Sequence, residues 1–164
     1  MINIKNPIIL VSIILCSAIP FKLVFNNDLS TLENSIEKSD TKVIYTIYND
    51  LTNIEKEEGR KVILKYMKSL EEEVSTGVED PKEAIGKIND ISQISEVKEE
   101  VIKVRNNILD IEESQISFNK AERAKEEGDY KKALDNYNNV IKEDKKNYEE
   151  SRKKIKEIKD YLEN

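Results

Sequence analysis

The segment ISEVKEEVIKVRNNILDIEESQISF, residues 94–118, decides the fold. Its apolar side chains recur at alternating spacings of three and four residues, which places them on one face of an α-helix. No glycine or proline interrupts the chain from Ser95 to Glu127, so we predict a single helix there, about 50 Å long. The members of this seam are Ile94, Val97, Val101, Val104, Ile108, Ile111, Gln115 and Phe118.

Two interpretations of the seam are open. A repeat of seven residues is typical of coiled coils, so residues 94–118 would pair with a second copy in a homodimer. Alternatively, neighbouring helices of the same chain cover the seam. We favour the second interpretation because the seam has few heptads and short helical segments flank it on both sides.

The composition predicts an all-α fold. The 164 residues include only four Gly and three Pro, whereas 37% are charged, well above the roughly 25% usual in globular proteins. Apolar residues recur at helical spacing through residues 28–92 as well. Gly77 is a natural helix terminator there, and Asp80 followed by Pro81 is a typical helix start. The expected apolar faces are Leu29, Leu32, Ile36; Ile44, Ile47, Leu51, Ile54; Ile63, Met67, Leu70, Val74; and Ala84, Ile85, Ile88, Ile91.

Several kinds of chemistry are excluded by the residues present. The chain has no His and a single Cys, Cys16, which rules out imidazole catalysis, disulfide frameworks and Cys/His zinc sites. Its four glycines are scattered and form no phosphate-binding loop. Residues 50–100 hold 14 acidic and eight basic side chains, and no region is a basic stripe. We therefore predict no enzymatic activity, no cofactor, no metal site and no nucleic-acid partner.

The first 27 residues are predicted to be a signal peptide or a membrane anchor. Residues 7–21 carry no charge and are rich in Ile, Leu and Val, behind one lysine. An uncleaved anchor over residues 8–25, a signal cleaved near Cys16-Ser17-Ala18, and a lipoprotein signal lipidated at Cys16 are all open, although Leu15 departs from the lipobox. A buried first helix of a soluble domain is a further alternative. We expect a body that is extracytoplasmic and membrane-anchored, or secreted.

Residues 114–147 carry a second pattern, SQISFNKAERAKEEGDYKKALDNYNNVIKEDKKN. Small residues lie where two helices would cross, and Gly128-Asp129-Tyr130 would form the turn between them. This pattern resembles a tetratricopeptide (TPR) repeat. The matching positions are Ala121, Ala124 and Ala133 at the crossing, Leu134, Tyr137, Val140 and Ile141 in the core, and Asp144 at the end of the second helix.

The resemblance implies an α-solenoid of antiparallel, TPR-like helical hairpins behind an N-terminal hydrophobic helix. Its expected parts are the signal or anchor at 1–27, degenerate hairpins at 28–92, and the long helix, repeat and closing helix at 93–164. TPR proteins bind partner peptides on a concave face. The residues of this chain at the matching positions are Gln115, Phe118, Asn119, Glu122, Lys125, Arg152, Lys153 and Lys156.

The function predicted from these features is a non-catalytic scaffold that binds a protein or peptide partner. A structural stalk or oligomerising helical spacer of the cell envelope is the alternative. The excess of Ile, Lys, Asn and Glu also resembles envelope proteins from AT-rich bacterial genomes.

Overall fold

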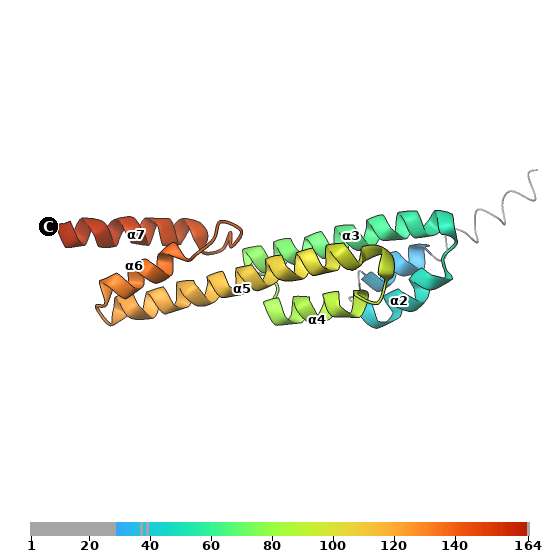
Figure 1. The fold of residues 1–164 in the computed structure, drawn as a ribbon, viewed down its shortest axis with the longest axis horizontal. Coiled ribbons are helices and arrows are strands. Elements are labelled where there is room, and N and C mark those ends of the chain that lie inside the picture. The colour runs from blue at the N-terminus through green and yellow to red at the C-terminus, as the bar shows by residue number, and fades with distance from the viewer. Residues whose placement is uncertain (1–28, 37, 39, 164) are drawn as a thin grey trace, which may run out of the picture. The chain divides into compact units, whose positions relative to one another are not determined.

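The computed structural model describes residues 29–163 apart from residues 37 and 39. All regular structure in this part of the chain is helical, with no strand, so the all-α prediction is confirmed (Figure 1). The predicted signal or anchor at residues 1–27 lies outside the described residues. The described residues divide into two compact units, one up to residue 63 and one from residue 64, which are described separately.

The first unit contains a helix over residues 29–36, helix α2 (Thr41–Asp50) and the beginning of α3 (Asn53–Thr76). Gly59 on α3 is needed for close packing, because a Cβ there would lie 2.8 Å from Leu51 Cδ1 and 3.1 Å from Leu32 Cδ2. The buried apolar residues of this unit are Leu32, Ile36, Ile44, Tyr48, Leu51 and Ile63.

The prediction of one apolar helix face that continues through Leu51 to Ile54 is wrong at its end. Helix α2 ends at Asp50, Leu51 is extended, and Ile54 is 81% exposed on α3. A capping box begins the new helix, since the Thr52 N–H donates to Glu55 Oε2 (2.9 Å) and the Glu55 N–H donates to Thr52 Oγ1 (3.4 Å). This local chemistry separates Ile54 from the helix that precedes it.

In the second unit, the predicted helix boundaries around Gly77 are confirmed. Helix α3 ends at Thr76, and Gly77 follows with φ +76°, a conformation that glycine adopts without strain. Helix α4 (Pro81–Ile91) starts behind Asp80, whose carboxylate accepts from the N–H groups of the next turn. Of its expected face, Ala84, Ile88 and Ile91 are buried and Ile85 is half-buried.

The predicted long helix is present with a small change at its start. Residues Ser95–Val97 form a 3₁₀ turn, η1, and α5 (Lys98–Glu126) follows it without a break. Helix α4 packs against α5. The central seam residues are almost fully buried within one chain, which agrees with the interpretation that neighbouring helices cover them. These residues are Val101, Val104, Ile108 and Ile111, at most 7% exposed.

Helix α6 (Tyr130–Asn138) packs between α5 and α7 (Tyr148–Glu163), and Gly128 makes the turn before it with φ +78° (Figure 1). The expected small residues lie where these helices meet. Partly buried Phe118, Tyr130 and Leu134 border the cluster. Its buried members are Ala121, Ala124, Ala133, Tyr137, Ile155 and Ile158.

The expectation that this second helix extends past Val140 and Ile141 to Asp144 is wrong. Helix α6 stops at Asn138, and the following loop places Val140 and Asp144 in the interior. To continue the helix, the Ile141 N–H would have to donate to the Tyr137 carbonyl, but each of these groups has another partner. The Ile141 N–H donates to Ser114 Oγ (3.1 Å), and the Tyr137 carbonyl accepts from Arg152.

Candidate functional site

Charged side chains from α5 and α7 converge around the hydroxyl of Tyr137 on α6. Tyr137 Oη donates to the carboxylate of Glu122. Lys125 on α5 lies 3.9 Å from Glu157 on α7, and Lys154 Nζ lies 3.8 Å from the same Glu157 carboxylate and 3.1 Å from Glu150. We call this group the polar face, and its members are Glu122, Lys125, Tyr137, Glu150, Lys154 and Glu157.

Contacts within the polar face shift the pKa values of three of its members. Burial, followed by the hydrogen bond to Glu122, raises the pKa of Tyr137 well above its ordinary value, so the hydroxyl remains a donor at neutral pH. The hydrogen bond between Lys154 and Glu150 raises the pKa of the lysine and lowers that of the glutamate. Three carboxylates lie beside Lys125 and Lys154, and Lys153 at the edge also approaches Glu157 (4.0 Å), so the charges of the face balance.

The predicted binding residues on α5 divide between this face and structural roles. Glu122 and Lys125 belong to the polar face. Phe118 packs edge-on to Tyr137, with ring centroids 5.8 Å apart. Gln115 donates to the Val74 carbonyl (3.1 Å) and thereby joins α5 to α3. Asn119 is exposed.

The predicted residues on α7 divide in the same way. Arg152 donates to the carbonyls of Tyr137 and Val140 and lies over the Tyr148 ring, 5.1 Å from its centroid. It therefore caps the carboxyl end of α6 and has little freedom to meet a partner. Lys153 lies at the edge of the polar face, 4.0 Å from Glu157. Lys156 is exposed.

Three charged members of the polar face on α7 were not among the predicted residues: Glu150, Lys154 and Glu157. Their spacings of four and three residues are those of charged pairs on one helix face, a signal that could have identified them. The predicted binding residues instead followed the TPR pattern, which assigns Tyr137 to the core and not to the binding surface.

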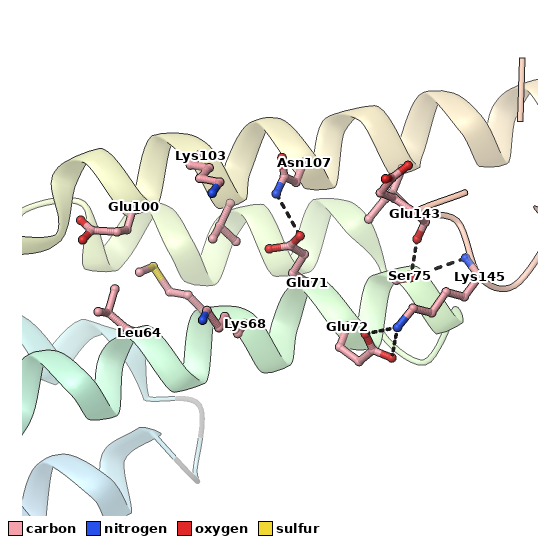
Figure 2. Close-up of a pocket in the computed structure, with 13 residues that line it drawn as sticks. Leu64, Lys68, Glu71, Glu72, Ser75, Glu100, Lys103, Asn107, Glu143 and Lys145 are labelled. Carbon is pink, nitrogen blue, oxygen red and sulfur yellow. Dashed lines mark hydrogen bonds and ion pairs between the residues drawn. The ribbon is translucent and has the colours of Figure 1, made fainter. Parts of the chain in front are cut away.

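A second candidate is a hollow of about 570 Å³ between α3 and α5 (Figure 2). Glu71 and Asn107 point toward each other across it and form a 2.9 Å hydrogen bond. At one end Lys145 reaches Glu72 (2.6 Å). Charged side chains such as Lys68 and Lys103 line its rim.

The floor of the hollow offers little surface to a ligand. Met67 is 0% exposed, Ile111 1% and Val104 7%, so almost none of their apolar surface faces solvent. The hollow is therefore a surface groove between packed helices, and the polar face is the stronger candidate for binding.

No group of three or more metal-ligating side chains is placed to hold an ion among the residues that the structure describes. Within residues 29–163, none of the helices combines the length and the apolar character that crossing a bilayer requires. Compared with family models, with curated proteins and with solved structures, the chain matches none of them.

Proposed function

We propose that this chain is a non-catalytic interaction protein whose C-terminal helices bind a segment of another polypeptide. The finer fold in this proposal is a TPR-like hairpin formed by α5 and α6 and closed by α7. Supporting it are the buried alanines at the helix crossings, the turn at Gly128 and the packing of α6 on both of its neighbours. A stack of such hairpins presents an extended surface, which suits a polypeptide better than a small molecule.

The observation that carries the proposal is the polar face. Its charged groups come from two helices far apart in sequence and are held around one buried tyrosine hydroxyl. They are partly exposed, with 31% of the Lys125 side chain and 46% of the Glu157 side chain accessible. A partner segment can therefore exchange with these ion pairs at modest cost, because exposed pairs contribute only about 0–1 kcal/mol each.

The accessible carboxylates define the partner's chemistry. Glu150 and Glu157 are partly exposed, with 42% and 46% of their side chains accessible, so the polar face can accept a segment that brings a basic side chain. Glu150 and Glu157 are the more accessible acceptors, since Glu122 already accepts from Tyr137. We expect a weak, salt-sensitive and reversible contact.

The proposal places this body outside the cytoplasm, behind residues 1–27 acting as a signal or an anchor. Intact-mass analysis with cell fractionation of the expressed protein tests it. Retained, cleaved and Cys16-lipidated forms differ in mass and in membrane association. Full-length protein found freely dissolved inside cells would contradict this part of the proposal.

Partner binding is tested by a pull-down from detergent-solubilised bacterial envelope, using the full chain. Glu157→Lys reverses a charge in the polar face, and we expect it to lose the partner recovered by the wild type. Glu149→Lys is the matched control, because Glu149 is an exposed glutamate on the same helix outside the polar face. Equal recovery by both variants would contradict the site, and no partner above background with the wild type would contradict the function.

The alternative function, an oligomerising helical spacer, is supported by a separate observation. Helix α5 exposes a line of apolar side chains on the side away from its buried seam.

A further inference from the structure

Three large apolar side chains on α5 face solvent at intervals of seven residues. Ile102 is 52% exposed, Leu109 38% and Ile116 44%. Their neighbours Val101 and Ile108 are buried on another side of the same helix. The three side chains, which we call the outer stripe, extend over about 21 Å of helix. Solvent-facing apolar residues scattered singly are normal, but a line at coiled-coil spacing indicates a helical partner.

We propose that the outer stripe pairs with the outer stripe of a second copy, with the two α5 helices antiparallel and the two-fold axis at Leu109. In this arrangement Leu109 meets its own counterpart, and Ile102 meets Ile116 of the second copy. The pairing rests on the oligomerising role and is independent of binding at the polar face. It also uses a different side of α5 from the buried seam, which was the predicted dimer interface.

Charge complementarity selects the second copy and its direction. On one flank of the outer stripe, antiparallel pairing brings Arg105 beside Glu112 of the second copy. On the other flank it brings Glu99 beside Lys120 of the second copy. Each attractive pair occurs twice by symmetry, because a two-fold interface uses the same patch on both chains.

Parallel pairing is less favourable for the same residues. It would place Glu112 beside Glu113 of the second copy, again twice, so that like charges meet beside the stripe, and only Lys98 beside Glu99 would form an attractive pair. Flanking charges are known to set partner choice and orientation in paired helices. The Arg105, Glu112, Glu99 and Lys120 side chains are all exposed or half-exposed.

The interface is small. Three apolar side chains per copy bury less surface than a standard protein–protein interface, which takes about 1,200–2,000 Å². We therefore expect a reversible dimer whose population depends on protein concentration, with a dissociation constant in the micromolar range.

Sedimentation equilibrium of the full chain in detergent, with Cys16→Ser to prevent oxidation, tests the pairing. The wild type should dimerise, and Leu109→Glu should weaken the dimer at least tenfold, because two carboxylates would meet at the axis. Val78→Glu is the matched control, since Val78 is an apolar loop residue that is 79% exposed and does not belong to the stripe. A wild type that stays monomeric, or a dimer that Leu109→Glu leaves unchanged, would overturn the proposal.

A charge-swap experiment distinguishes the loss of an interface contact from misfolding of the variant. Arg105→Glu should weaken the dimer, and Arg105→Glu combined with Glu112→Arg should restore it, with the helical circular-dichroism signal unchanged throughout. Spin labels on Asn119→Cys then report direction. Antiparallel helices place the two labelled positions about 30 Å apart along the axis, whereas parallel helices place them about 10 Å apart. Failure of the double variant to restore the dimer, or the short distance, would refute antiparallel pairing.

Discussion

Asp144 offers the sharpest test of how the loop between α6 and α7 is held. Its side chain is fully buried. Its carboxylate accepts from Ser114 Oγ on α5 (2.9 Å) and from Asn147 Nδ2 (2.9 and 3.1 Å). The Asp144 carbonyl also accepts from the Tyr148 N–H at the start of α7 (2.9 Å). One residue thus connects α5, the loop and the helix that carries half of the polar face.

Replacing this carboxylate should be costly. Asp144→Ala leaves the Ser114 hydroxyl and the Asn147 amide, both buried, without their acceptor. Each hydrogen bond to a charged group contributes about 1.5–3 kcal/mol to stability, and the substitution removes the acceptor of two donors. Removing the buried charge offsets part of that loss. We expect a loss of about 3 kcal/mol from the free energy of unfolding. Asp144→Asn keeps the shape and one acceptor oxygen, so its loss should be about 1–2 kcal/mol.

Urea unfolding of the two variants and the wild type, followed by circular dichroism, measures these differences. For a unit of this size the Asp144→Ala loss corresponds to a fall of about 12 °C or more in Tm. A change within about 0.5 kcal/mol of the wild type, the range typical of surface substitutions, would refute the reasoning. So would an alanine variant more stable than the asparagine variant.

The structure predicts the outcomes of three further substitutions. Tyr137→Phe removes the hydroxyl bonded to Glu122 and should cost about 1–1.5 kcal/mol at pH 7. Because the folded state raises the pKa of Tyr137, the free energy of unfolding of the wild type should fall as pH rises above about 10. Urea titrations between pH 9 and 11 should show a smaller decrease for Tyr137→Phe. Gly86→Ala, in an open position on α4, should raise stability by about 0.5–1 kcal/mol in thermal melts. Gly128→Ala, at φ +78°, should lower stability by about 1 kcal/mol by the same measurement.

Sequence patterns succeeded where the determining chemistry is local. The Asp80-Pro81 start of α4 and the stop at Gly77 follow from capping and backbone preferences within a few residues. The seam of α5 follows from helical periodicity over several turns. At Ile54 the local signal was present but overlooked, because Thr52 and Glu55 already form a capping box in the sequence.

The end of α6 was beyond local prediction. Helical spacing alone favours continuing through Val140 and Ile141. What stops the helix is Arg152, 15 residues further along from Tyr137, and Ser114, 27 residues before Ile141. Those contacts exist only after α5 and α7 have packed.

The same limit applies to the polar face. Glu122 and Lys125 were predicted from their positions on α5. The members on α7 depend on how that helix is rotated, which the burial of Ile155 and Ile158 against α6 decides. A sequence pattern identifies the charged residues of α7 but not which of them turn toward Tyr137.

The carboxyl end of α3 has a consequence for the order in which the protein assembles during synthesis. Ser75 donates its hydroxyl to the Glu143 carbonyl, and the Ser75 carbonyl accepts from the Lys146 N–H (3.0 Å). Since about 70 residues separate these partners, the last turn of α3 leaves the ribosome long before they do. Until then its open carbonyls depend on water, and a nascent chain that stalls before the loop emerges would expose a frayed helix end to proteases and chaperones.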